Sequence, residues 1–186
     1  MSEYRIGIIG CGGSGKTAVA RIVAKELEIP VLESKSITQP ILDRDGYDYS
    51  SGIQIEQFLA QCNRQAEMLD KTIAQHQSPS FVTDRTLIDF AAYSINETYK
   101  SDMDTLKHVL MQCQAGVCRY THLFLCPWPE QQIRSNDRRT LNPYYQFIIH
   151  SLELGILEDW GLHFYQLESS SPEDRAHEVL ADVNFW

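Results

Sequence analysis

Short apolar runs alternate along this chain with longer segments in which apolar residues recur at helical spacing. Strands of a buried parallel sheet are predicted at residues 4–9, 29–33, 80–85, 120–126 and 163–167. Helices are predicted at residues 17–27, 53–76, 87–99, 102–114, 143–160 and 171–183. Because strands and helices alternate, the pattern predicts the α/β class, with a five-stranded parallel sheet covered by helices on both faces.

Residues 34–52 interrupt this pattern with mostly polar and turn-forming residues, and we expect an irregular connection there. A loop of this length in a compact domain is usually functional or mobile. Arg44, Tyr47 and Tyr49 could contact a substrate in it. A solvated connection without a ligand is the equal alternative.

Composition limits the classes of partner. The chain of 186 residues suits a single domain, 1–186, and its net charge of −9 disfavours a broad electrostatic contact with DNA or an anionic membrane. No apolar run approaches the roughly 20 residues of a membrane span, and the N-terminus lacks a signal-peptide layout. The five cysteines include no C-x-x-C pair and are expected to be reduced thiols. We therefore expect a cytoplasmic protein.

The first apolar run leads into a glycine-rich loop that matches G-x-x-x-x-G-K-[ST] at every fixed position, and a predicted helix follows it. Backbone N–H groups in such a loop turn inward and form a concave anion site, which the helix N-terminus reinforces. The lysine is expected to reach the β- and γ-phosphates of a nucleotide, and the threonine to bind Mg²⁺. The predicted nucleotide-binding residues are Gly10, Gly12, Gly13, Ser14, Gly15, Lys16, Thr17 and Ala18. The alternative, a glycine-rich turn without a ligand, does not account for the lysine and the hydroxyl.

Cys11 lies inside this loop, at the N-terminus of the following helix. That position could favour a thiolate, and oxidation would then block the site. The preferred alternative is a small residue that simply fits the loop.

Acidic residues end two of the other predicted strands, where ligands bind in open α/β sheets. Glu33 ends the second strand, either at the reaction site or as a surface glutamate. Asp84 ends the third strand, and it supports the metal ion, caps the helix that begins near Leu87, or does both.

The segment Asp84-Arg85-Thr86-Leu87-Ile88-Asp89, followed by Ala92-Tyr93, resembles the D-R-[ST]-x-x-D…A-Y stretch of small P-loop kinases. These include nicotinamide riboside kinase-like domains and nucleoside or nucleotide kinases of phages and bacteria. The phosphate loop, Glu33 and an arginine-rich segment at residues 134–139 occur in the order of that family, so the resemblance covers nearly the whole chain. It implies the P-loop NTPase fold.

The resemblance also implies a role for each charged residue. Glu33 would accept the proton of an attacking hydroxyl, Asp84 would support Mg²⁺, and Arg85 would clamp the acceptor or its phosphate. The arginines of a lid at about residues 130–142 would close over the triphosphate and neutralise it: Arg134, Arg138 and Arg139. Lid closure would also exclude water and suppress hydrolysis.

The function implied is an ATP- and Mg²⁺-dependent kinase that transfers the γ-phosphoryl group to a small acceptor, either a nucleoside or a nucleotide. One alternative is a kinase that acts on a modified base or an end in DNA, which the net charge disfavours. Another is a nucleotide-dependent ATPase or switch that works through a protein partner. The acceptor, the choice between ATP and GTP, and the oligomeric state are not readable from the sequence.

Overall fold

The secondary structure comes from a computed structural model, which describes residues 3–45, 55–98, 103–128 and 143–183. Its strands are β1 (Arg5–Ile9), β2 (Val31–Leu32), β3 (Phe81–Thr83), β4 (His122–Leu125) and β5 (Tyr165–Gln166). Its helices are α1 (Lys16–Glu26), α2 (Ser34–Asp45), α3 (Ile55–Gln75), α4 (Leu87–Thr98), α5 (Met103–Val117), α6 (Pro143–Asp159) and α7 (Pro172–Val183).

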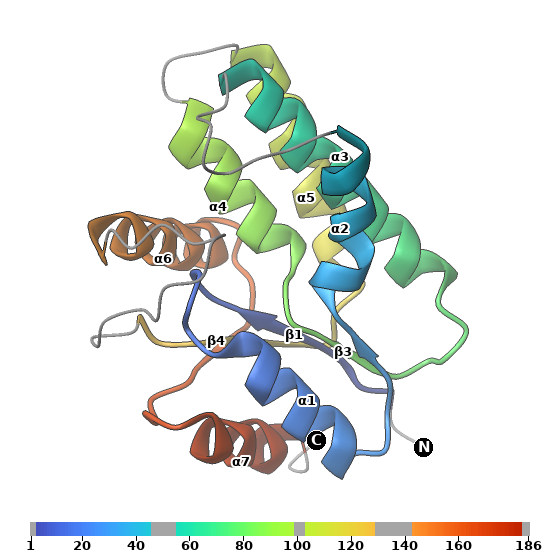
Figure 1. The fold of residues 1–186 in the computed structure, drawn as a ribbon. Helices are drawn as coiled ribbons and strands as arrows, with labels where there is room; N and C mark the ends of the chain where they lie inside the picture. Colours follow the sequence, from blue (N-terminus) through green and yellow to red (C-terminus); the bar gives the residue numbers. More distant parts are fainter. Residues whose placement is uncertain (1–2, 46–54, 99–102, 129–142, 184–186) are drawn as a thin grey trace.

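The five strands form one parallel sheet in the order β2-β3-β1-β4-β5. The central strand β1 carries the isoleucines Ile6, Ile8 and Ile9, all completely buried, as a strand with covered faces requires. In Figure 1, α1 and α7 lie on one side of the sheet, and α3, α4, α5 and α6 lie on the other. The predicted fold class, with helices on both faces, is confirmed.

Each face of the sheet has its own hydrophobic core. One core joins β1 to α1 and α7 through residues such as Val19, Val23 and Val179. The other joins the sheet to α3, α4, α5 and α6, with Leu69 and Phe90 among its buried side chains. The larger core thus supports α4 and α6, which flank the loop that follows β1.

The prediction of an irregular segment is wrong for residues 34–45, which form α2. Thr38 donates a hydrogen bond from Oγ1 to the Ser34 carbonyl at 2.8 Å, and Ile41 is buried with 6% of its surface exposed. Pro40 lies inside the helix, where a proline normally weakens the backbone hydrogen bonding. Burial and long-range contacts outweigh that local signal. Tyr47 and Tyr49 lie outside the described residues.

The cysteines match the expectation of reduced thiols. All five are free, and four of them are buried: Cys11, Cys62, Cys113 and Cys126. None of the described helices is both long and apolar enough to cross a membrane.

Gly116 in α5 permits a close approach to α4, and alanine there is expected to destabilise the fold. An added Cβ would lie 2.2 Å from Leu87 Cδ1 and 2.7 Å from Asp70 Oδ1. Leu87 is fully buried and cannot move aside, so Gly116→Ala should lower the free energy of unfolding by about 1–3 kcal/mol in urea titration. Gly155 is the matched control, because nothing lies within 4 Å of its Cβ position. Gly155→Ala should raise the free energy of unfolding by about 0.4–1 kcal/mol, and equal losses in both variants would contradict this account.

Candidate functional site

The glycine-rich loop connects β1 to α1 at the carboxyl end of the central strand. Gly13 and Gly15 have φ angles of 89° and 91°, a region that side chains disfavour, so glycine is needed at both positions. Helix α1 begins at Lys16, and its first N–H groups therefore adjoin the loop. Ser14 lies in the loop with a buried hydroxyl that has no hydrogen-bond partner among the described residues. The loop has the backbone shape and helix terminus of a phosphate site.

Lys16 is buried beside this loop, with 8% of its surface exposed. Its Nζ donates hydrogen bonds to the carbonyl oxygens of Gly10 and Cys11, the latter at 3.0 Å, and lies 3.8 Å from Asp89 Oδ1. Burial alone would lower the pKa of Lys16. The surrounding acidic groups, Asp89 first among them, outweigh this effect and raise the pKa above its ordinary value. The lysine therefore remains a cation.

Thr17 and Asp84 meet next to the loop. Thr17 Oγ1 donates a hydrogen bond to Asp84 Oδ2 at 2.7 Å, which joins α1 to the end of β3. Asp84 Oδ1 accepts a second hydrogen bond, also 2.7 Å, from the N–H of Ser34. A hydroxyl and a carboxylate at a phosphate site are the hard oxygen donors that Mg²⁺ prefers. The two residues predicted for the metal thus fit it as a pair.

Asp84 caps a different helix from the one considered as the alternative. Its bond to the Ser34 N–H stabilises the start of α2, whereas the start of α4 is capped locally. Thr86 Oγ1 accepts a hydrogen bond from the Ile88 N–H, and Asp89 Oδ2 accepts one from the Thr86 N–H at 2.8 Å. This reciprocal arrangement is a capping box, with aspartate in the usual place of glutamate. Asp84 is therefore not needed to cap α4, and its carboxylate bonds to Thr17 and Ser34 instead.

Glu33 lies immediately after β2 and forms a bidentate ion pair with Arg21 of α1. Arg21 Nε and Nη2 donate to the two carboxylate oxygens at 2.6 and 2.8 Å. These hydrogen bonds hold the pKa of Glu33 below its ordinary value. Glu33 is thus an ionised carboxylate, and its neighbour Ser34 contacts Asp84 directly.

Arg85 joins the group around Lys16. Its guanidinium lies over the rings of Phe90 and Tyr93, 5.5 and 5.3 Å from their centroids. It also interacts electrostatically with Lys16 and Asp89. The structure therefore brings Lys16, Thr17, Asp84 and Arg85 to one end of the sheet. Three of the predicted site residues lie outside the described ranges: Arg134, Arg138 and Arg139.

Three buried polar residues at this end of the sheet are absent from the sequence-based prediction. Arg175 of α7 donates from Nη1 to the Ser14 carbonyl at 2.5 Å and from Nε to the Ser169 carbonyl at 2.6 Å, so it braces the loop. Gln146 and Glu153 of α6 are 3% and 0% exposed. Their seven-residue spacing places them on one face of a largely apolar helix, which is the signal that could have identified them.

Cys11 does not have the character of a reactive thiolate. Burial raises its pKa to about 12, despite the nearby positive charge of Lys16. The thiol is therefore protonated and inaccessible, and the alternative of a small residue that fits the loop is supported.

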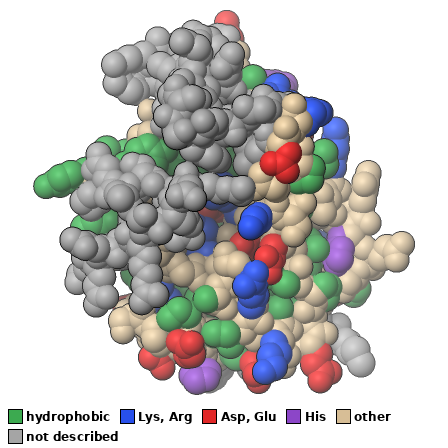
Figure 2. All heavy atoms as spheres, in the orientation of Figure 1, with side chains coloured by type: hydrophobic (Ala, Val, Ile, Leu, Met, Phe, Trp, Pro, Cys, Tyr) green, Lys and Arg blue, Asp and Glu red, His purple; other side chains and the backbone are tan. Residues whose placement is uncertain are grey.

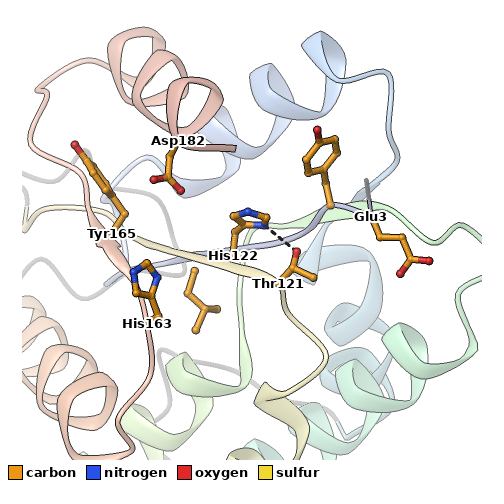
Figure 3. A pocket seen from close by; sticks show the side chains of 8 residues that line it. Glu3, Thr121, His122, His163, Tyr165 and Asp182 are labelled. Atoms are coloured by element: carbon orange, nitrogen blue, oxygen red, sulfur yellow. Dashed lines mark hydrogen bonds between the residues drawn. The ribbon is translucent and has the colours of Figure 1, made fainter. Parts of the chain in front are cut away.

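A separate pocket of about 480 Å³ lies at the opposite end of the sheet (Figure 3). Thr121 and His122 line it at the start of β4, and His163 lines it just before β5. Thr121 Oγ1 and His122 Nδ1 are hydrogen-bonded at 2.8 Å. Because the phosphate loop follows the carboxyl end of β1, this pocket plays no part in the site described above.

Basic and acidic side chains are mixed over the described part of the face in Figure 2. On that part of the surface, no single-sign patch of the kind that binds the phosphate backbone of nucleic acid is visible. This distribution agrees with the net charge of −9.

Solved structures with this fold include several kinases. NadR protein in complex with NAD and AMP-PNP matches with a TM-score of 0.69 and 12% identity over 99% of this chain, which spans only 49% of the NadR chain. Deoxyadenosine kinase from M. mycoides, with dCMP and dCDP bound, matches with a TM-score of 0.66 and 12% identity over 96% of this chain and 97% of the kinase. Thymidylate kinase from Candida albicans matches with a TM-score of 0.69 and 14% identity over 97% of this chain and 90% of the kinase. At these identities the likeness establishes the fold.

No curated protein sequence matches the chain. A family model described as an AAA domain does match, over residues 5–175. This range begins with β1 and extends into α7, and so it includes the phosphate loop, Asp84 and Arg175. The chain therefore belongs to this AAA domain family and has the fold of the P-loop nucleoside and nucleotide kinases.

Proposed function

We propose that the chain is an ATP-dependent kinase that transfers the γ-phosphoryl group to a nucleoside or nucleotide. The observation that carries this proposal is the contact between Thr17 and Asp84 beside the buried cation Lys16. An anion cradle, a cation and a pair of metal ligands at one point are the parts that phosphoryl transfer requires. Glu33, at the end of the neighbouring strand β2, adds a carboxylate at the same edge of the sheet.

In the proposed reaction, a hydroxyl oxygen of a nucleoside, or a phosphate oxygen of a nucleotide, forms a bond to the γ-phosphorus. The bond from that phosphorus to the β–γ bridging oxygen breaks, and its electron pair stays on the ADP product. Where the attacking group is a hydroxyl, Glu33 accepts its proton. Lys16 holds the phosphate oxygens, and Thr17 and Asp84 would hold Mg²⁺, which supplies positive charge to the phosphates when bound.

Arg85 is proposed to contact the acceptor. Its guanidinium belongs to the group around Lys16 and is held in place by the rings of Phe90 and Tyr93 on α4. The predicted lid arginines Arg134, Arg138 and Arg139 are proposed to complete the charge around the triphosphate. Positioning and charge neutralisation supply most of the rate enhancement in this type of reaction.

The similar structures support a nucleoside or nucleotide as the acceptor. They are NadR bound to AMP-PNP or to NR, a deoxyadenosine kinase with nucleotide products, and a thymidylate kinase. Because the chain spans about half of the NadR chain, only this part of the NadR fold bears on the proposal.

The proposal is tested by incubating the protein with Mg²⁺ and γ-labelled ATP, together with nucleosides, nucleoside monophosphates or short DNA. Transfer of label to a nucleoside or a monophosphate is expected. Label on DNA would favour the DNA-kinase alternative, and release of inorganic phosphate without any labelled acceptor would favour the ATPase or switch. A variant with Thr17→Val and Asp84→Asn, in which both metal ligands are lost, serves as the control for contaminating kinases.

A further inference from the structure

Glu153 is a buried carboxyl group for which the proposed reaction has no role. It lies on α6, is 0% exposed, and neither of its carboxyl oxygens has a hydrogen-bond partner among the described residues. Buried polar groups are normally paired, because an unpaired one costs free energy. An exception beside a phosphate loop therefore requires an explanation.

The surroundings of Glu153 combine charges from several elements. The groups that interact electrostatically with its carboxyl are Cys11, Lys16, Arg85, Asp89, Tyr93 and Cys126. They come from the phosphate loop and the start of α1, from the β3–α4 segment, and from the end of β4. Glu153 therefore faces the same cation that the nucleotide is expected to contact.

The two acidic members of this group differ in their hydrogen bonds. Asp89 accepts bonds from the Thr86 N–H and Oγ1 at 2.8 and 2.9 Å, and its other oxygen lies 3.8 Å from Lys16. These contacts favour the ionised form of Asp89, although burial still leaves the pKa of Asp89 above its ordinary value. Glu153 has no such contacts, and burial, with the negative charge of Asp89 added to it, raises the pKa of Glu153 well above its ordinary value. Of the two carboxyl groups, Glu153 is therefore the one that more readily holds a proton.

We propose that Glu153 is a positioning residue that acts through Lys16: its carboxyl, by gaining or losing a proton, decides whether the lysine is held against α4 and α6 or is available to a bound nucleotide. The inference rests on the nucleotide site proposed above. It adds a residue that controls the binding step.

The physical basis is the number of negative charges around Lys16. While Glu153 is protonated, the carboxylate oxygen that pairs with Lys16 Nζ is Asp89 Oδ1 at 3.8 Å, a distance longer than a hydrogen bond. Phosphate oxygens can then compete for the ammonium group. An ionised Glu153 would add a second buried negative charge, which would both hold Lys16 and repel the phosphates. Nucleotide binding is thus linked to a single proton.

The described cysteines, tyrosine and lysine in this surrounding do not change charge near neutral pH. Burial raises the pKa of Cys11 to about 12 and that of Cys126 to about 11. Tyr93 and Lys16 have pKa values raised above their ordinary values. Burial lowers the pKa of His150, which lies one turn from Glu153 on α6, so this histidine is neutral above pH 7. A pH effect on nucleotide affinity in this range is therefore attributable to the two buried carboxyl groups, Glu153 and Asp89, and the Glu153→Gln variant separates them.

The test is the affinity for Mg²⁺-ADP, measured by calorimetry from about pH 5 to about pH 9 for three proteins: the unmodified chain, Glu153→Gln and Glu158→Gln. The affinity of the unmodified chain is expected to fall by up to about tenfold per pH unit above the pKa of Glu153, since one proton is linked. Glu153→Gln mimics the protonated carboxyl and should bind ADP as tightly as the unmodified chain does at pH values below the pKa of Glu153, with no such fall. Glu158 is exposed on the same helix, so Glu158→Gln should retain the pH dependence.

Identical pH profiles for the unmodified chain and Glu153→Gln would overturn the inference, as would a flat profile for Glu158→Gln. Absence of ADP binding in all three proteins would overturn both this inference and the proposed function. ADP binding without transfer to any acceptor would overturn only the kinase. The measurement of ADP affinity therefore distinguishes failure of the Glu153 inference from failure of the proposed kinase activity.

Thermal unfolding gives a second measurement, which does not depend on nucleotide. An acid whose pKa is raised in the folded state costs stability as the pH rises above the unfolded pKa, and the cost levels off above the folded pKa. The difference in Tm between Glu153→Gln and the unmodified chain should therefore increase in favour of the variant from about pH 5 to about pH 8. A difference that is constant with pH would overturn the assignment of the proton to Glu153.

Discussion

Replacing Lys16 with methionine is expected to reduce phosphoryl transfer by about 10³-fold or more. The lysine donates hydrogen bonds to the loop carbonyls of Gly10 and Cys11, and methionine removes its charge while keeping much of its length. The charge acts mainly where negative charge develops in the reaction, so kcat should fall more than ADP affinity. Transfer of label from γ-labelled ATP to the acceptor measures the rate, and an unchanged kcat would eliminate the proposed role of the loop.

Because Lys16 is buried, this substitution also affects stability. Methionine leaves the fully buried Asp89 without its ion-pair partner, and breaking a buried pair costs about 3–5 kcal/mol. Adding Asp89→Asn removes the stranded charge, and the double variant should recover much of the lost Tm without recovering transfer. Recovery of transfer in the double variant would mean that Lys16 acts only by stabilising the fold.

Replacing Glu33 with glutamine is expected to lower kcat by about 10²–10⁴-fold while Mg²⁺-ADP still binds. Glutamine has the shape of glutamate, but it cannot accept the proton of the attacking hydroxyl. Rapid-quench measurement of a single turnover separates the transfer step from product release. Loss of nucleotide binding, with an unchanged rate for each bound complex, would instead identify Glu33 as a structural residue.

Arg21 provides a control for the role of Glu33. Its hydrogen bonds hold the pKa of Glu33 below the ordinary value, so Glu33 remains ionised down to low pH. Arg21→Gln should raise that pKa and shift the acidic limb of the kcat profile to higher pH. A substitution of an exposed lysine of α1, Lys25→Gln, should leave the profile unchanged.

The fold could be predicted largely from the sequence because its strands are short apolar runs, and the G-x-x-x-x-G-K-T match marks where the first strand ends. Helix α2 could not, since its first N–H bonds to Asp84, which lies 50 residues away, and its proline argued against a helix. A contact between residues so far apart in the chain leaves no signal in the local sequence pattern.

The candidate site could likewise be predicted from the sequence only in part. Lys16, Thr17 and Asp84 belong to recognisable motifs, and the structure brings Thr17 and Asp84 within a hydrogen bond of each other. Arg175 and Glu153 belong to no motif, and each stands as one charged residue among the apolar positions of a helix. Their importance depends on tertiary packing that brings α7 and α6 against the loop, which no periodicity can show.

The two hydrogen bonds of Asp84 connect the proposed metal ligands to a distant part of the chain. One oxygen accepts a hydrogen bond from the hydroxyl of Thr17, and the other accepts one from the first backbone N–H of α2, directly after Glu33. A cation that drew this carboxylate toward itself would shift the start of α2 and Glu33 in the same motion. Metal binding and the alignment of the acceptor would then both depend on the position of the Asp84 side chain.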